Sequence, residues 1–365
     1  MRLTAEETAR AARFFSEGIH RLANRPVRLM EVCGTHTVAI FRAGIRQLLP
    51  PNVELVSGPG CPVCVTPNEY LDTAIAYSCN PDIIITTFGD MLKVPGSESS
   101  LMAEKAKGAD IRIVYSPLDS LTIAQENPNK KIVFLAVGFE TTAPTAAATI
   151  LQAELQGLTN FFVLSAHKVV PPALSAILAG PQTKVDGFLL PGHTVAISGL
   201  APYRFVSQEY AVPAVVTGFE ALDILQGIYL LLEQISAGKA ELVNQYRRVV
   251  KPDGNPAARE ILSRVYQPDN TAWRGFGVIA GSGLALRAAY QRFDAKVSLP
   301  LGKVESQEPA GCRCGEVLRG LIVPADCPHF GLSCTPEQPV GACMVSVEGA
   351  CAAWYKYGQG RWSYA

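Results

Sequence analysis

Eight short apolar runs, each followed by a turn rich in Gly, Pro or Thr and then by a helical segment, constrain the fold of this chain more than any other feature. The runs cover residues 27–32, 53–57, 82–88, 111–115, 132–137, 161–165, 187–190 and 214–217, and a polar break at 127–131 separates the first four from the last four. Short apolar strands that alternate with helices are typical of parallel sheets covered on both faces. We therefore predict two α/β domains, at residues 27–130 and 131–245.

The most unusual turn holds the Cys-x-x-Cys sequence Cys61-Pro62-Val63-Cys64. Residues 52–57 have strand character, the Gly-Pro-Gly at 58–60 breaks the run, and residues 68–77 have apolar side chains at helical spacing. Thiols placed just before a helix lie near unpaired N–H groups, which favours the thiolate. A structural zinc half-site, or two cysteines that only pack, is the alternative. Because no second Cys-x-x-Cys completes a zinc site, the sequence favours reactive chemistry.

The composition excludes several classes of protein. The chain has 365 residues, 48% of them hydrophobic, with 32 basic and 32 acidic side chains and no basic block, so nucleic acid is not an expected partner. The N-terminal 22 residues have an amphipathic helical pattern, with Thr4 and Glu7 spaced as a capping box and no signal-peptide pattern. Because no uncharged apolar run is long enough to span a membrane, we expect a cytoplasmic protein. Its ten cysteines are then better explained as redox groups or metal ligands than as a disulfide framework.

Polar and sulfur-containing side chains gather directly after the predicted strands. They are Cys33, His36, Cys61, Cys64, Thr87, Asp90, Glu140, Thr141, Thr142, His167 and His193. Ligands of open parallel sheets bind at the carboxyl ends of the strands, so these residues are candidates for one crevice between the two domains. The alternative for each is a helix cap or a satisfied surface group; Thr141 or Thr142, for example, would serve as an N-cap.

The C-terminal part of the chain has a different character. We expect helices over residues 219–250, a Pro/Gly break at 251–256, and a Cys-rich third domain formed by residues 1–26 and 246–365. After Gly311 there are six cysteines among prolines and glycines, and this composition leaves so few apolar residues for a core that we expect a bound metal to stabilise the fold of this region. Cys312, Cys327, Cys334 and Cys351 leave gaps of 14, 6 and 16 residues, and this spacing leaves an iron–sulfur cluster and zinc equally open.

Taken together, the motifs resemble those of the hydrogenase maturation factor HypD family along nearly the whole chain. The resemblance is carried by CGTHT at 33–37, GPGCPVCVTP at 58–67, GFETTAP at 138–144, PGH at 191–193 and the cysteine block at 312–351. It implies two Rossmann-like α/β domains and a third domain that holds a [4Fe-4S] cluster. It also implies a scaffold that works with the small chaperone HypC, and transiently with HypE as cyanide donor, to assemble the Fe(CN)2CO unit of [NiFe]-hydrogenases.

The resemblance also assigns roles to residues. It implies that Cys33 binds the iron of the Fe(CN)2CO unit, that Cys61 and Cys64 form a redox-active pair, and that Cys312, Cys327, Cys334 and Cys351 hold the cluster. Electrons would pass from the cluster to the thiol pair. His36 and His193 are candidate donors to the cyanide ligands and Glu140 is a candidate proton relay or cap, whereas Cys314 and Cys343 receive no role.

Two other functions fit parts of this pattern. A cluster-dependent disulfide reductase would use Cys61 and Cys64 on a protein partner but would not need Cys33 or His193. A binding module would use the cluster and the thiols only for structure. The chain lacks a Walker-type phosphate loop, which argues against a conventional P-loop ATPase. We therefore expect a redox-active assembly scaffold rather than a conventional turnover enzyme.

Overall fold

Parallel strands form two sheets in the computed structural model, which describes residues 4–180 and 184–358. Within these residues the first sheet has the strand order β2-β1-β7-β8-β9 and the second has the order β4-β3-β5-β6. The first sheet consists of β1 (Val27–Glu31), β2 (Val53–Ser57), β7 (Gly187–Pro191), β8 (Ala214–Thr217) and β9 (Leu242–Asn244). The second consists of β3 (Ile83–Thr87), β4 (Ile111–Ile113), β5 (Lys131–Gly138) and β6 (Phe161–His167).

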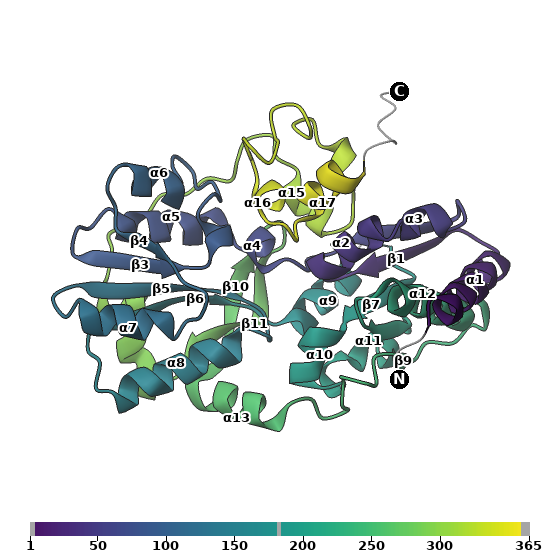
Figure 1. Cartoon of the computed structure of the whole chain (residues 1–365), viewed down its shortest axis with the longest axis horizontal. Helices are drawn as coiled ribbons and strands as arrows, with labels where there is room; N and C mark the ends of the chain where they lie inside the picture. Colours follow the sequence, from purple (N-terminus) through teal and green to yellow (C-terminus); the bar gives the residue numbers. More distant parts are fainter. Residues whose placement is uncertain (1–3, 181–183, 359–365) are drawn as a thin grey trace.

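All eight predicted strands are present, but their distribution between the sheets differs from the expected one. The first two strands pair with β7 and β8 instead of with β3 and β4, so the sheets do not divide at residue 130. The chain crosses to the second sheet after β2 and returns after β6 (Figure 1). Apolar runs reveal strands and their parallel direction, but they do not reveal which neighbour each strand selects.

Helices that flank the first sheet include the N-terminal one. They are α1 (Ala5–Leu22), α2 (Gly34–Arg42), α3 (Ile45–Leu48), α10 (Gly192–Ser198), η2 (Ala201–Tyr203), α11 (Phe205–Gln208) and α12 (Ala221–Ser236). The predicted capping box of Thr4 and Glu7 begins α1, and the rings of Phe14 and Phe15 pack on Tyr229 of α12. Residues 4–26 therefore belong with the first sheet and not with the Cys-rich region. Residues 219–250 are only partly helical, because α12 ends before Gly238, whose φ is +64°, and β9 follows.

The second sheet is covered by helices and by a hairpin from far along the chain. The helices are α5 (Asn68–Ser78), η1 (Gly89–Met91), α6 (Leu101–Ala106), α7 (Asp119–Glu126), α8 (Ala143–Leu155), α13 (Pro256–Val265), η3 (Ala288–Phe293) and α14 (Ala295–Ser298). The helix α9 (Val170–Ala179), which follows β6, lies on the side of β7 and contacts β11 (Figure 1). The antiparallel hairpin of β10 (Tyr266–Trp273) and β11 (Gly277–Leu286) packs on β6, where Ser165 donates a hydrogen bond to the carbonyl of Leu284. The segment from α13 to α14 thus completes this unit and lies outside the Cys-rich region in which we expected it.

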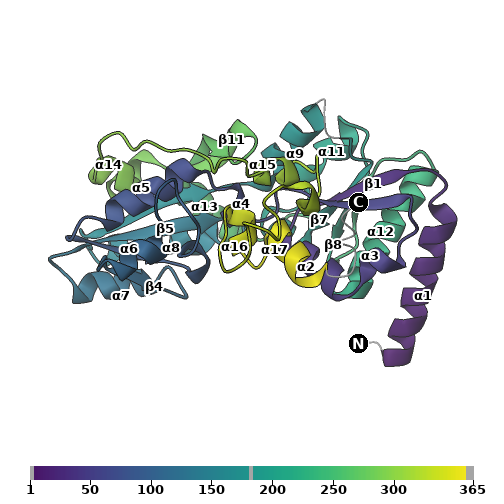
Figure 2. The ribbon, with the colours of Figure 1, turned by 90° about the horizontal axis from the view of Figure 1, so that it is seen from above.

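A small third unit, the Cys-rich lobe (residues 311–357), lies over the junction of the two sheets (Figures 1 and 2). Its elements are α15 (Cys314–Leu318), η4 (Pro324–Asp326), α16 (Ala342–Val345) and α17 (Ala350–Tyr357). Both α15 and α16 contact the short helix α4 (Pro62–Val65), and α17 contacts α2. The lobe is therefore anchored on the two cysteine-bearing turns of the first sheet.

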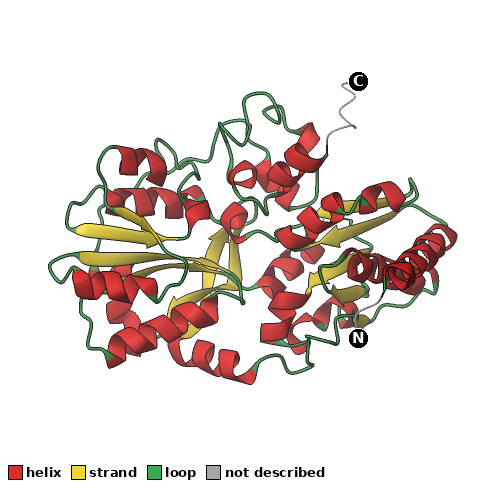
Figure 3. Cartoon of the chain, in the orientation of Figure 1, coloured by secondary structure: helices red, strands yellow, loops and turns green. Residues whose placement is uncertain are grey.

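The strands of both sheets run toward the middle of the molecule, so their carboxyl ends face one another (Figure 3). The turns that follow β1, β2, β5, β6 and β7 consequently meet near this junction, as the parallel topology predicts. Among the described residues, no helix combines the length and the hydrophobicity that crossing a lipid bilayer requires.

Candidate functional site

Cys33 lies at the junction of β1 and α2, where its backbone is extended and the helix begins at the next residue. Its side chain is buried, with 3% of its surface exposed. The buried carboxylate of Glu31 fixes the turn, because one oxygen accepts the N–H of Cys33 at 3.0 Å and the other accepts the hydroxyl of Thr37. A buried carboxylate at the end of β1 therefore determines how this cysteine is presented.

Glycines allow the Cys33 turn to contact two other parts of the chain. The N–H of Gly34 donates to the carbonyl of Gly60, the residue directly before Cys61, at 3.1 Å. A Cβ atom on Gly60 would overlap the backbone of Cys33, and a Cβ atom on Gly34 would overlap Glu348 of the Cys-rich lobe. Three of the motifs recognised in the sequence thus meet in backbone contact.

The surroundings of Cys33 hold its thiol in the protonated form. The pKa of Cys33 is raised to about 12, mainly by burial and with smaller contributions from the carboxylates of Glu348 and Glu31, against the lowering effects of the His36 N–H and the Thr35 hydroxyl. The expectation that a position before a helix favours the thiolate is not met here, because loss of solvation outweighs the helix terminus. Binding of a metal ion at Cys33 would have to release this proton.

Cys61 and Cys64 form a disulfide in the structure, with their α-carbons 5.2 Å apart. Cys61 is the N-cap of α4, and its sulfur accepts the N–H of Cys64 at 3.2 Å. Both side chains are almost fully buried. The predicted order of strand, turn and helix is correct, with the short helix α4 inserted before α5.

His36 and His193 are far apart in the sequence, but both rings contact the same aromatic ring, that of Phe219. The ring of His36 stacks on Phe219 at 4.6 Å and that of His193 lies 5.0 Å away. His36 is fully buried, and its Nε2 faces the carbonyl of Gly218 at 2.9 Å, so this nitrogen carries the proton and Nδ1 is left as an acceptor. Burial lowers the pKa of each histidine to about 4. Both rings are therefore neutral near pH 7, and the N–H of His36 is already used.

Glu140 lies at the carboxyl end of β5, on the second sheet. Its Oε1 accepts the N–H of Val170 at the start of α9, at 2.8 Å, whereas Oε2 is buried without a hydrogen bond to any described residue. Burial raises the pKa of Glu140 to about 7, and its charge contributes to the raised pKa of Tyr203 from the first sheet. Glu140 is thus a helix-capping carboxylate that also faces the other half of the molecule.

The other residues singled out after strands are less closely associated. His167 is buried against the edge of the Tyr266 ring, and burial lowers its pKa to about 3. Thr142 occupies the expected N-cap position of α8, but its hydroxyl donates to the carbonyl of Phe139 and caps no helix N–H. Asp90 is exposed, Thr141 is half-buried, and the Thr87 hydroxyl bonds locally to Phe88.

The six cysteines of the Cys-rich lobe line one small cavity, together with His329, Phe330, Gly341 and Met344. They are Cys312, Cys314, Cys327, Cys334, Cys343 and Cys351. The sulfur of Cys334 accepts the N–H of Val340 at 3.3 Å, a contact of the kind that stabilises a metal-bound thiolate. No three His, Cys, Asp or Glu side chains in the described ranges converge as the ligands of a single ion would. An all-thiol cavity fits a multi-iron cluster, whose cysteine ligands bind different irons.

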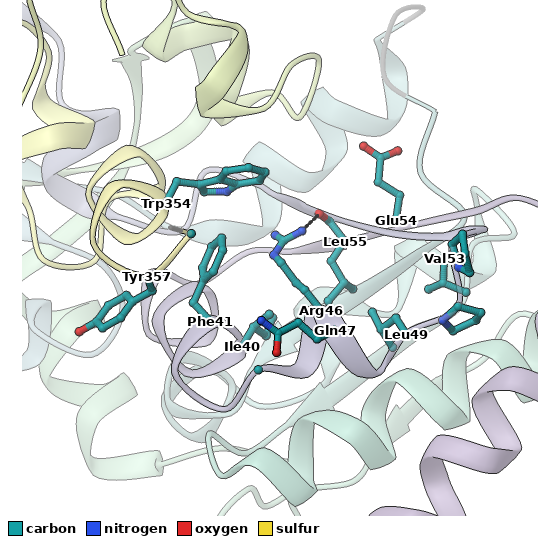
Figure 4. A pocket seen from close by; sticks show the side chains of 14 residues that line it. Ile40, Phe41, Arg46, Gln47, Leu49, Val53, Glu54, Leu55, Trp354 and Tyr357 are labelled. Carbon is teal, nitrogen blue, oxygen red and sulfur yellow. Dashed lines mark hydrogen bonds between the residues drawn. The ribbon is translucent and has the colours of Figure 1, made fainter. Parts of the chain in front are cut away.

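A separate groove lies on the outer side of α2, between α3, β2 and α17 (Figure 4). Arg46 lies over the rings of Phe41 and Trp354, at 4.8 and 5.3 Å, and its Nη1 donates to the carbonyl of Leu55. These contacts tie α2 to the edge strand and to the Cys-rich lobe. The groove has no cysteine or histidine among its lining residues, so it offers no sulfur or imidazole ligand to the site.

Sequence reasoning missed three charged residues of the site: Glu31, Glu348 and Arg274. Glu31 was detectable, because it is a charged residue that directly follows the apolar pair Leu29-Met30 at the end of its strand. Glu348 accepts the hydroxyl of Thr35 at 2.6 Å, and Arg274 donates to the carbonyl of Cys64 at 3.1 Å. Both come from parts of the chain whose placement over the Cys turns has no local signal in the sequence.

Comparison with known proteins gives a consistent result. The sequence profile described as "HypD: Hydrogenase formation hypA family" matches residues 10–358. The hydrogenase maturation factor HypD of Escherichia coli K12 is 48% identical over 338 residues, which cover 92% of this chain and 91% of that protein. The factor of the same name from Rhodobacter capsulatus is 46% identical over 351 residues, covering 95% and 93% of the two chains. That of Cupriavidus necator is 45% identical over 338 residues, covering 90% and 89%.

Proposed function

Because the chain belongs to the HypD family of hydrogenase maturation factors, we propose that it works with HypC as the scaffold on which the Fe(CN)2CO unit of a [NiFe]-hydrogenase is assembled. The observation that carries this proposal is the meeting of Cys33, the Cys61–Cys64 loop and the Cys-rich lobe at Gly34 and Gly60. A binding module with purely structural cysteines would not require these three elements to converge.

In this proposal Cys33 binds the iron that is the cargo of the scaffold. A low-spin ferrous ion with cyanide ligands favours soft thiolate donors, and HypC would supply a second one. The thiol of Cys33 must lose its proton when iron binds. Glu31 and Glu348 are the carboxylates whose charges act on this thiol, so they are the groups placed to accept the proton.

The cyanide ligands, donated with the help of HypE, need hydrogen-bond donors around them. The N–H groups of the Gly-rich turns and the ring of His193 are suitable donors. His36 is less suitable than we expected, because its N–H is bonded to Gly218 and its second nitrogen is an acceptor. Its role in the proposal is to fix the Cys33 helix against the turn after β8, where Thr217 also contacts it at 3.0 Å.

The Cys-rich lobe would hold a [4Fe-4S] cluster through Cys312, Cys327, Cys334 and Cys351, which lie around one cavity. When bound, the cluster would supply electrons one at a time. Cys61 and Cys64 would provide the two-electron partner: their disulfide takes up two electrons and two protons to give two thiols. The contacts of α4 with α15 and α16 keep this pair against the lobe.

Infrared spectroscopy tests the proposal directly. The chain is purified anaerobically with HypC from cells that contain the complete maturation machinery, and the cyanide and carbonyl stretching region is recorded together with an iron count. We expect bands in this region that disappear in Cys33→Ala and persist in Cys79→Ala, since Cys79 is an exposed free cysteine on α5's C-terminal side. A silent spectrum from a complex with an intact four-iron cluster would instead favour a cluster-dependent disulfide reductase.

A further inference from the structure

Arg274 lies in the turn between β10 and β11 and is buried, with 4% of its surface exposed. Although it is 210 residues from Cys64 in sequence, its guanidinium group lies against the Cys-x-x-Cys loop. Burial of an arginine side chain costs free energy unless its N–H groups are hydrogen-bonded, so its contacts indicate what it does.

Those contacts are directed at the end of α4. Nε of Arg274 donates to the carbonyl of Cys64 at 3.1 Å, and Nη2 donates to the carbonyl of Thr66 and to Oδ1 of Asn68, each at 2.8 Å. The backbone N–H of Arg274 donates to the carbonyl of Val65 at 2.8 Å. The last carbonyls of a helix have no partner within the helix, and one planar guanidinium here binds several of them in fixed directions.

The other side of the guanidinium and the next residue attach the loop to the rest of the molecule. Nη1 of Arg274 forms an ion pair with Glu308. Gly275, with φ of +82°, packs so closely on Gly315 that a Cβ atom on either would overlap the other backbone. Because Gly315 follows Cys314, the β10–β11 turn contacts both the disulfide loop and the Cys-rich lobe.

We infer that Arg274 is a positioning residue that sets the equilibrium between the disulfide and the dithiol forms of Cys61 and Cys64. This inference rests on the redox role proposed above for the pair. Reduction breaks the S–S bond and, with two electrons and two protons from a dithiol reductant, forms two S–H groups. With α4 held at its C-terminal end, the two α-carbons stay near their present 5.2 Å, a distance at which a disulfide forms without strain.

The direction of the effect follows from conformational entropy. The disulfide restrains the loop by itself, so the guanidinium restrains mainly the dithiol form. Removing the guanidinium contacts would give the reduced loop more freedom and would lower the effective concentration of one thiol near the other. The equilibrium should then shift toward the dithiol. A purely electrostatic role would act in the opposite direction, because a nearby positive charge stabilises thiolates.

The test is a redox titration of the complete chain in mixtures of reduced and oxidised dithiothreitol. The fraction of Cys61–Cys64 disulfide is measured by alkylation and mass spectrometry of the peptide. We expect Arg274→Lys and Arg274→Met each to shift the equilibrium about tenfold toward the dithiol, equivalent to a midpoint about 30 mV less negative. The control is Arg292→Met, at an arginine whose side chain is 58% exposed and pairs with Glu154, and its midpoint should equal that of the unaltered chain.

Other results would overturn the inference. The inference is wrong if neither Arg274 variant shifts the equilibrium, or if the shift is toward the disulfide. It is also wrong if Arg274→Lys keeps the equilibrium of the unaltered chain while Arg274→Met changes it, because the planar guanidinium would then not be required. If the Arg274 variants do not fold, Asn68→Ala removes one of the accepting groups, and we expect a shift of about threefold in the same direction; its absence would count equally against the inference. A pair that cannot be reduced and reoxidised in the unaltered chain would overturn both this inference and the redox part of the proposed function, whereas a reversible pair that is indifferent to Arg274 would overturn only the inference.

Discussion

The backbone N–H of Gly34 donates a hydrogen bond to the carbonyl oxygen of Gly60 at 3.1 Å, and this bond joins the turn of Cys33 to the turn of the Cys61–Cys64 disulfide. Neither glycine has a positive φ, so conformation alone does not require them. Close backbone approach does, since a Cβ atom at position 60 would overlap Cys33. The distance between the two sulfur sites is thus set by main chain rather than by adjustable side chains.

Gly60→Ala should therefore damage the site and the fold together. We expect a loss of about 1–3 kcal/mol in the free energy of unfolding, because the added methyl group has no room without moving the Cys33 backbone. Urea denaturation measures this loss, and the iron content of the complex with HypC should fall with it. Gly302→Ala is the matched control, since a Cβ atom there meets nothing within 4 Å. Equal stability of the two variants would contradict the argument.

Glu140 should make stability depend on pH. Burial raises the pKa of Glu140 to about 7 in the folded chain from the ordinary value of 4.5, so the folded state binds this proton more tightly than the unfolded state does. Its contribution to stability is therefore largest below pH 4.5, declines as the pH rises, and is lost above pH 7. A rise in pKa from 4.5 to about 7 corresponds to a change of up to about 3 kcal/mol in the free energy of unfolding across this range.

The substitution Glu140→Gln isolates this contribution, because the amide oxygen can still accept the N–H of Val170. We expect the difference in unfolding free energy between Glu140→Gln and the unaltered chain to move in favour of the variant as the pH rises from 4.5 to 7. Denaturant titrations at several pH values measure it. Glu305→Gln, at a carboxylate whose side chain is 85% exposed, should show no such trend. Parallel curves for Glu140→Gln and the unaltered chain would show that the carboxyl group is not desolvated.

The local structure of this chain was predictable, whereas its assembly was not. The apolar runs and the Gly and Pro breaks between them identified the strands β1 to β8, and the spacing of apolar residues identified the capped helix α1, since these features depend on residues close in sequence. The strand β9 has only two apolar residues, with polar neighbours on both sides, so it gives no strand pattern. The division of strands between the two sheets depends on contacts between distant segments. The same is true of the hairpin that covers β6.

The candidate site shows the same division. Cys33, Cys61 and His36 were identifiable because a cysteine or histidine after a strand has few structural reasons to be there. Their chemistry was less predictable. Whether a thiol near a helix start ionises depends on solvation, and Cys33 is buried too deeply for the helix terminus to prevail. Arg274 was not predictable, because its partners lie far away in the sequence and include the backbone carbonyls of Cys64 and Thr66, which any residue would supply.

Thr37→Val should weaken the turn that presents Cys33. Thr37 donates its hydroxyl to Oε1 of Glu31, whose other oxygen holds the N–H of Cys33. Valine keeps the shape but leaves a buried carboxylate oxygen without its donor, which costs about 1–3 kcal/mol. Urea denaturation should show this loss, and Thr37→Ser, which retains the hydroxyl, should recover most of it. If Thr37→Ser is as unstable as Thr37→Val, packing of the methyl group and not the hydrogen bond is responsible.

Single serine substitutions should separate the cluster ligands from the other cysteines. We expect the chain purified anaerobically to contain about four irons and four acid-labile sulfides, following the proposed cluster. Cys327→Ser should lose most of this iron, because serine is a poor ligand for a site built from soft thiolates. Cys79→Ser should keep it, since Cys79 is exposed and lies outside the cavity of the lobe. Full iron content in Cys327→Ser would remove this residue from the ligand set.

Loss of the cluster should also unfold the lobe without unfolding the sheets. The lobe consists of helices of three to eight residues and turns, and six of the ten residues that line its cavity are cysteines. The sheets, in contrast, are supported by strands such as β3 and β5, whose residues are all buried except Lys131 at the start of β5. Limited proteolysis of Cys327→Ser should therefore cleave within residues 311–357 while the fragment before residue 300 resists, and Cys79→Ser should resist throughout. Equal resistance of the lobe in both variants would show that packing against α2 and α4 holds it in place without the metal.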